Sequence, residues 1–178
     1  MGAATLPLMR SLPVIDMAEF AANPGSDAGA AFVRDLLAAA HGPGFAYLSG
    51  HGVDPALDRR LFEMSRAFFS LPAAEREALA IENSAAFRGY TVLGDERTNG
   101  RSDWRHQLAV GPEQDAPVMG PGDPAWLKLR GPNQWPASLP AMPAAVLDWM
   151  AAMDHVGLTA LRALAVGLRQ PIDHFDSG

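Results

Sequence analysis

The sequence contains no cysteine. Disulfide bridges, thiolate metal sites and a cysteine nucleophile are therefore excluded. It also lacks any run of the roughly 20 apolar residues that crossing a bilayer requires. Residues 1–10 hold no charged leader followed by a long apolar stretch, so they do not resemble a secretory signal. We therefore expect a cytoplasmic protein that does not contact a membrane.

Positive charge is scarce. The chain has 14 Lys and Arg against 20 Asp and Glu, a net charge of -6, and its basic residues are scattered. A phosphate backbone binds to clustered cations, so we expect no nucleic-acid partner. With 178 residues, 48% of them hydrophobic, the chain is long enough for one globular domain. We expect that domain to span residues 1–178, with residues 1–11 flexible.

Capping residues and apolar spacing predict the helices. Ser26 or Asp27 can cap a helix that runs through Ala40, and Asp54 can cap the next, with Pro55 at its first position. The buried stripes expected from the spacing are Phe32, Leu36 and Ala39 in the first helix and Leu57, Leu61, Met64 and Phe68 in the second.

Two further helices are expected, a short charged one over residues 73–80 and a long one from beyond Pro143 to about Leu168. The stripe expected on the long helix comprises Val146, Trp149, Met153, Val156, Ala160 and Leu164.

Strands and loops account for the rest. Short apolar runs predict strands at Leu12–Asp16 and Phe45–Leu48. Between residues 87 and 140, Gly and Pro recur every few positions, which predicts long shaped loops. Trp104, Trp126 and Trp135 are expected to anchor these loops in the core.

Five short motifs, taken in order, resemble the N-terminal region of the isopenicillin N synthase-like oxygenases. They are Leu12–Asp16 (the family's PVIDL), residues 44–53 (GFFYL and HGI), Phe68–Pro72 (FFxLP), Arg88–Tyr90 with Gly94, Glu96 and Asp103–Arg105, and Gly131–Pro136 (GPNxWP). Each motif alone is weak, but their order over residues 12–170 covers nearly the whole chain.

The resemblance implies an α+β fold, a helix-rich N-terminal half with a few strands and long Gly/Pro loops. In the family this half packs on a double-stranded β-helix, or jelly roll, which we expect to be absent from this chain. The parent enzyme would use iron(II), O2 and 2-oxoglutarate to oxidise a small-molecule substrate. This chain would contribute scaffold and substrate-pocket residues.

The family's iron ligands, a His-x-Asp pair and a distal His, are expected downstream of this sequence. The segment from His174 to Asp176 has the spelling of that pair, but only Ser177 and Gly178 follow it. We interpret it as a decoy, because a third ligand from His51 or His106 would reverse the family's ligand order. We therefore expect no catalytic residue, no metal ligand and no tight binding of iron(II) or 2-oxoglutarate by this chain alone.

The resemblance places Arg88, Tyr90, Glu96 and Thr98 near the mouth of the substrate pocket. Polar groups in a mostly apolar pocket fix the orientation of a substrate. The spacing from Arg88 to Tyr90 is one residue shorter than the family's Arg-x-Gly-Tyr. A second interpretation stays open, a structural turn in which Arg88 pairs with Asp95 or Glu96.

Two histidines have simpler interpretations. His51 is expected to bond the backbone of its own turn, and His106, where the family often has an acidic residue, to lie on a surface or loop. Two alternatives to the oxygenase fragment also stay open. One is a stand-alone, non-catalytic helical module that binds a partner protein, and the other is a split enzyme completed by a separate chain.

Overall fold

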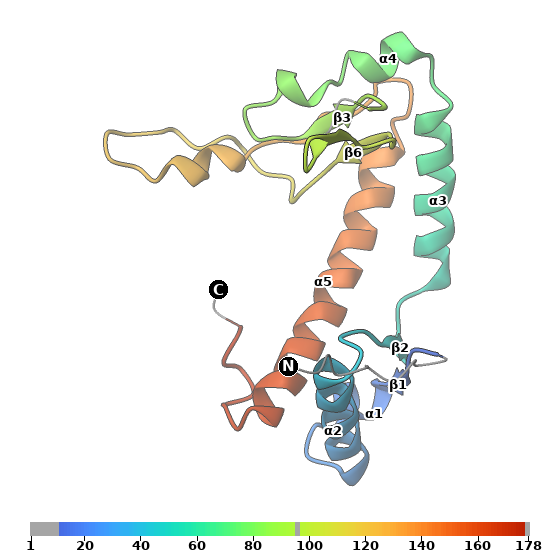
Figure 1. Cartoon of the computed structure of the whole chain (residues 1–178), viewed down its shortest axis with the longest axis vertical. Coiled ribbons are helices and arrows are strands. Elements are labelled where there is room, and N and C mark those ends of the chain that lie inside the picture. Colours follow the sequence, from blue (N-terminus) through green and yellow to red (C-terminus); the bar gives the residue numbers. More distant parts are fainter. Residues whose placement is uncertain (1–10, 95–96, 177–178) are drawn as a thin grey trace, which may run out of the picture. The chain divides into compact units, whose positions relative to one another are not determined.

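The computed structural model describes residues 11–94 and 97–176. The described residues form two compact units, which fall within residues 1–54 with 151–178 and within residues 55–150. Figure 1 labels the helices α1 to α5 and the strands β1, β2, β3 and β6. The segment expected to be flexible, residues 1–11, lies almost entirely outside the described residues, and the single-domain span of 1–178 stays a prediction.

The first unit contains a parallel strand pair. β1 (Val14–Asp16) pairs with β2 (Tyr47–Ser49), and Ile15 lies opposite Leu48. α1 (Ala18–Ala22) and α2 (Asp27–His41) connect the two strands. Parallel strands need a long crossover, which these two helices supply. Both predicted strands are present, each within two residues of its expected start.

The core of the first unit follows the predicted stripe of α2. Ser26 Oγ accepts a hydrogen bond from the Gly29 amide at 3.0 Å, as the predicted N-cap requires. Phe32 is buried and its ring lies 5.4 Å from that of Phe20. Ala163, from α5 (Met142–Gly167), is fully buried in the same cluster.

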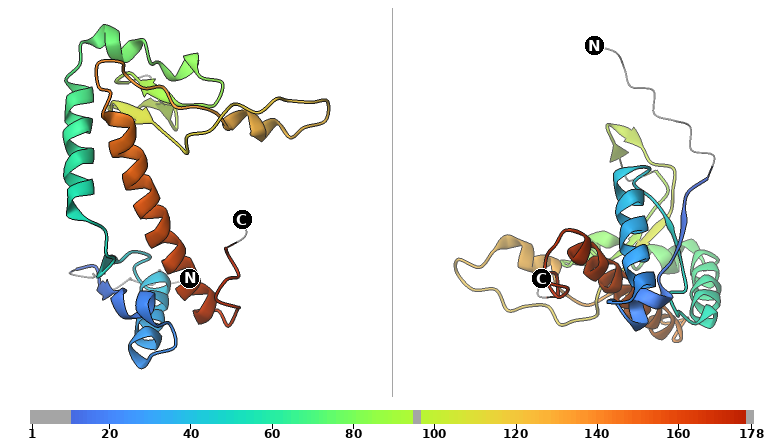
Figure 2. Two further views of the ribbon diagram at one scale, coloured as in Figure 1. Left: turned by 180° about the vertical axis from the view of Figure 1, so that it is seen from behind. Right: turned by 90° about the horizontal axis from the view of Figure 1, so that it is seen from below.

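The second unit holds the remaining elements, visible from behind in Figure 2. They are α3 (Pro55–Phe69), α4 (Ala73–Glu77), the 3-10 helices η1 (Ile81–Asn83) and η2 (Ala125–Leu129), the strands β3 (Gly89–Thr91), β4 (Arg97–Thr98), β5 (Arg101–Ser102) and β6 (Gln107–Ala109), and the start of α5. β3 pairs antiparallel with β6, and Tyr90 lies opposite Leu108. The helix expected over residues 73–80 is shorter than predicted, because the chain turns at Ala78 toward η1.

The core of the second unit forms around Phe68, which is fully buried. Tyr90, Met142 and Val146 complete its buried cluster. Leu61 and Met64 of α3 pack against that cluster, as their spacing predicted. α3 is tied to the start of α5 by Trp149, whose Nε1 donates to Asp58 at 2.8 Å. Because the Trp149 indole makes this polar contact, the stripe predicted on α5 is not purely apolar at that position.

The prediction that three tryptophans anchor the loops was wrong for two of them. Trp104 is 77% exposed and Trp126 is 55% exposed, whereas Trp135 packs against the core around Phe68. Spacing among glycines and prolines gives no period from which burial can be inferred. None of the helices in the described part of the chain has the length and apolar character of a membrane span.

Candidate functional site

The strand pair β3 and β6 holds the centre of the candidate site. The Tyr90 side chain is 2% exposed, and its hydroxyl lies 2.6 Å from Nδ1 of His106. The two rings are stacked, with centroids 5.8 Å apart and an interplanar angle of 10°. The guanidinium of Arg76 lies over the Tyr90 ring, 5.5 Å from its centroid. Tyr90 is thus a buried support that fixes the exposed imidazole of His106.

His106 borders a small, largely apolar hollow. The hollow has a volume of about 350 Å³, and Phe68, Phe69 and Val146 lie among its lining residues. His106 and Gln107 are its polar members at the β6 end. An apolar pocket with few polar groups is the usual form of a small-molecule site. The prediction that His106 lies on a surface or loop is confirmed, since it is exposed and lies outside the strands, but its bond to Tyr90 was not foreseen.

Arg88 directly precedes β3 and its guanidinium faces the backbone of Gly111. Its Nη1 donates to the carbonyl of Ala86 at 3.1 Å. Its Nε is buried and has no hydrogen-bond partner among the described residues. A side chain at Gly111 would overlap the guanidinium, so only glycine leaves room for Arg88 in this position.

The structure places Arg88 and Tyr90 within one short segment, but it describes neither Glu96 nor the side chain of Thr98. Arg88 directly precedes β3 and Tyr90 is at its centre. Glu96 lies outside the described residues, as does Asp95, so the alternative pairing of Arg88 with either carboxylate is not tested. Thr98 belongs to β4, but the description covers only its backbone. A substrate-binding role for these four residues stays a prediction.

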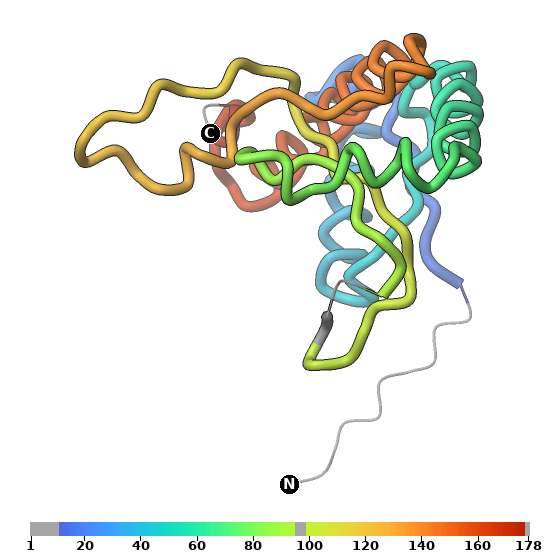
Figure 3. Tube along the Cα trace, turned by 90° about the horizontal axis from the view of Figure 1, so that it is seen from above, coloured from blue at the N-terminus to red at the C-terminus, as the bar shows by residue number. Residues whose placement is uncertain are grey.

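The sequence reasoning did not foresee the contacts of Asn133, which is 8% exposed. Its amide exchanges two hydrogen bonds with the backbone of Gly111, both at 2.8 Å. Its Nδ2 also donates to Glu113 at 2.9 Å. These bonds close the base of the loop over residues 112–132, which Figure 3 shows leaving and returning beside the segment around residue 85. The motif resembling GPNxWP therefore closes the loop, and its contacts with Gly111 and Glu113 form a clasp.

Gln134 extends that clasp to β3. Its Nε2 donates to the carbonyls of Arg88 at 2.7 Å and Ala80 at 2.9 Å. Gly89 has a φ of +136°, and a side chain there would overlap Gln134 and the Leu79 carbonyl. Gln134 thereby holds the backbone on which Arg88 and Tyr90 are presented.

Glu113 is the titratable group of the clasp. Its carboxylate accepts hydrogen bonds from the Asn133 side chain and backbone and from Trp135 Nε1, the last at 2.8 Å. Burial alone would raise the pKa of Glu113, but these bonds favour the charged form and lower the pKa below its ordinary value of 4.5.

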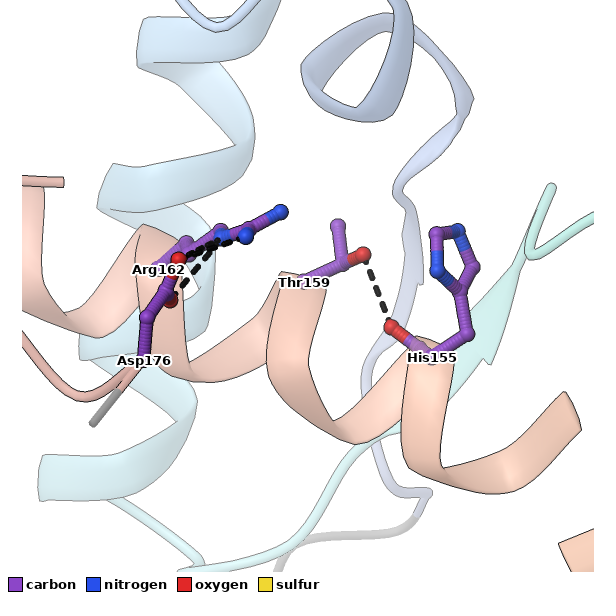
Figure 4. Close-up of polar contacts among 4 residues, drawn as sticks. All are labelled: His155, Thr159, Arg162 and Asp176. Carbon is purple, nitrogen blue, oxygen red and sulfur yellow. Dashed lines mark hydrogen bonds and ion pairs between the residues drawn. The ribbon is translucent and has the colours of Figure 1, made fainter. Parts of the chain in front are cut away.

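The aspartate of the His-x-Asp segment at residues 174–176 has a structural role. Both oxygens of Asp176 bind Arg162 of α5, with Nη2 to Oδ2 at 2.6 Å and Nε to Oδ1 at 3.0 Å (Figure 4). These hydrogen bonds from Arg162 lower the pKa of Asp176. Thr159 donates to the backbone of His155 in the preceding turn and does not contact this pair.

Metal-binding residues do not gather in the part of the chain that the structure describes. Among residues 11–94 and 97–176, no three His, Asp or Glu side chains are placed to hold one ion. His51 instead accepts a hydrogen bond from the Val53 amide at 3.2 Å, which confirms its predicted role in a local turn.

Comparison with known proteins identifies the family to which this chain belongs. Residues 12–138 match the family model for "non-haem dioxygenase in morphine synthesis N-terminal". The chain belongs to this family. The non-haem dioxygenase N-terminal assignment confirms the resemblance seen in the sequence and covers β1 through the clasp at Asn133.

Two curated relatives carry matching names. The chain is 36% identical over 168 residues to "2-oxoglutarate-dependent dioxygenase frbJ" of Dothideomycetidae sp. (strain 11243), covering 93% of this chain and 44% of that protein. It is 34% identical over 133 residues to a homoarginine-6-hydroxylase of Arabidopsis thaliana, covering 71% of this chain and 36% of that protein. The chain thus spans less than half the length of either relative.

A solved structure agrees with the fold. A 2OG-Fe(II) oxygenase family protein from Caulobacter crescentus superposes with a TM-score of 0.74 at 26% identity, covering 93% of this chain and 51% of that one. The mixed helix and strand architecture expected from the sequence is therefore that of the family, with few strands, as predicted.

Proposed function

We propose that this chain works as the N-terminal part of an iron(II)- and 2-oxoglutarate-dependent oxygenase that oxidises a small molecule. One observation carries the proposal: 93% of the chain aligns with a 2-oxoglutarate-dependent dioxygenase at 36% identity, over 44% of that protein's length. The same coverage supports a jelly-roll half as the natural partner of this chain. Neither of the two curated relatives named above favours a stand-alone partner-binding module.

In such an enzyme the iron and 2-oxoglutarate would supply oxidation of the substrate by O2. The described residues of this chain would hold neither group, so their contribution is to bind, orient and shield the substrate. His106 is a polar side chain that lines the hollow at the β6 end, and Tyr90 holds its ring. Arg88, Tyr90, Glu96 and Thr98 are proposed to shape substrate binding, with Tyr90 acting through His106.

The test uses the longest reading frame that contains this sequence. The expressed protein is loaded with iron(II) without oxygen, then given O2 and 2-oxoglutarate, and succinate is measured against an iron-free control. Iron-dependent succinate formation supports the proposal. The proposal would be refuted if the reading frame encodes no His-x-Asp and the expressed protein forms no succinate.

A further inference from the structure

The clasped loop of the second unit covers a hollow that the proposed oxygenase role does not use. It has a volume of about 560 Å³, within the usual range for small-ligand sites. One wall comes from the turn at residues 83–86 and the other from residues 116–132. Its apolar lining residues are Ala85, Ala86, Ala116, Pro117, Met119 and Pro132.

Both charged side chains that line the hollow among the described residues are cations, Lys128 and Arg130. The chain as a whole carries a net charge of -6. Neither makes an ion pair with a carboxylate that the structure describes. The local field therefore favours an anion.

Arg130 is held in place without an acidic partner. Its guanidinium lies over the ring of Trp126, 5.1 Å from the centroid. Stacking of this kind fixes the plane of the guanidinium and leaves its N–H groups free to donate. The planar fork matches the two oxygens of a carboxylate. This contact gives the exposed Trp126 a role that the sequence did not predict.

The walls of the hollow are fixed by the residues that close it. Ser84 Oγ accepts hydrogen bonds from the amides of Ala86 and Arg88, both at 3.2 Å. On the other side Asn133 bonds the Gly111 backbone. Gly131 packs so closely on Ala86 that a side chain there would overlap it. A preformed hollow spares a ligand the cost of ordering its walls.

We propose that this hollow binds a small organic carboxylate. Its apolar body would lie against Ala86, Pro117 and Met119, and its carboxylate would pair with Arg130 and Lys128. An inorganic anion would satisfy the two cations but leave the apolar walls in water, so an organic anion fits better. The site is formed within the second unit and does not depend on oxygenase activity.

The test is ligand-observed NMR on the full chain with 4-phenylbutyrate, its neutral amide and inorganic phosphate. We expect saturable binding of the carboxylate with a Kd below about 1 mM, and at least about tenfold weaker binding of the amide. Equal binding of carboxylate and amide would refute the charge pairing. Phosphate binding as tightly as the carboxylate would refute the apolar contact, and no saturable binding would refute the site.

Variants locate the binding. Arg130→Gln and Lys128→Gln should each weaken 4-phenylbutyrate binding several-fold, and Ala116→Phe should abolish it by filling the hollow. Arg59→Gln, an exposed arginine of α3, is the matched control and should bind as the wild type does. Melting curves confirm that each variant is folded. If Arg130→Gln loses stability because its stack on Trp126 is gone, Lys128→Gln decides. Unchanged binding in both cation variants, or an equal loss in Arg59→Gln, overturns the proposal.

Discussion

The Asn133 side chain forms a closed ring of two hydrogen bonds with the backbone of Gly111, both 2.8 Å long. The two residues are 22 positions apart, and the loop between them begins and ends at this contact. Through Gln134 the same segment also holds the backbone of Arg88. The candidate site around Tyr90 and His106 therefore depends on the buried side-chain amide of Asn133, which does not line the hollow beside His106.

Asn133→Ala should destabilise the chain. It removes the partner of two buried backbone groups and one bond to Glu113, and an unsatisfied buried group costs about 1–3 kcal/mol. In a chain of this size that corresponds to a fall in Tm of roughly 2–12 °C. Thermal denaturation followed by circular dichroism measures it. Asn83→Ala, which removes a single exposed bond, should change Tm far less.

Glu113 should make stability depend on pH. Its folded pKa is below the ordinary value of 4.5, so the unfolded chain binds a proton more readily. The stabilisation is complete above the unfolded pKa and is lost as the pH falls through the lower folded pKa. Denaturation series across this acid range should show a smaller pH dependence for Glu113→Gln. Glu63→Gln, the same change on the exposed side of α3, should keep the wild-type profile, and an identical profile in both variants would contradict the assignment.

Tyr90→Phe tests the support of His106. It deletes one hydroxyl and leaves the ring packed on Phe68. We therefore expect the free energy of unfolding to fall by about 0.5–1.5 kcal/mol and the fold to stay unchanged. Ring nitrogen chemical shifts from NMR should change at His106 and stay constant at the exposed His155. A His106 spectrum identical to that of the wild type would mean that the 2.6 Å contact does not persist in solution.

Arg88→Ala separates a substrate role from a structural one in the longer enzyme. Loss of a charge-assisted contact of about 1.5–3 kcal/mol should raise KM roughly 10- to 150-fold with kcat and iron content nearly unchanged. A structural role predicts a lower Tm with normal KM, because the guanidinium packs on Gly111 and bonds Ala86. Steady-state kinetics beside a melting curve distinguishes them.

The 178-residue chain should not bind iron(II) tightly through its His-x-Asp segment. Asp176 is held by two nitrogens of Arg162, and metal binding would have to break that pair. Anaerobic calorimetric titration should give no stoichiometric site with a Kd below about 10 µM. Such a site, if lost in His174→Ala, would show that the segment is a true ligand pair.

Local chemistry made part of this structure predictable. The cap at Ser26 and the stripe ending at Phe68 could be read from the sequence, because both depend on neighbours within a few positions. The contacts of Asn133 and the pairing of Tyr90 with His106 could not, since they join residues 22 and 16 positions apart across irregular chain. The resemblance marked both segments as noteworthy but gave no geometry.

Hydrogen bonds through Gly111, Glu113 and residues 133–135 fasten the loop over residues 112–132 where it begins and ends. We therefore expect a change in the length of its tip to leave β3 undisturbed. Closing a longer loop costs little, because the entropy grows only slowly with length. Insertions at its tip, or a single proteolytic nick there, would leave both ends attached. The loop is thus a place where related proteins can acquire new ligand contacts while keeping the same scaffold.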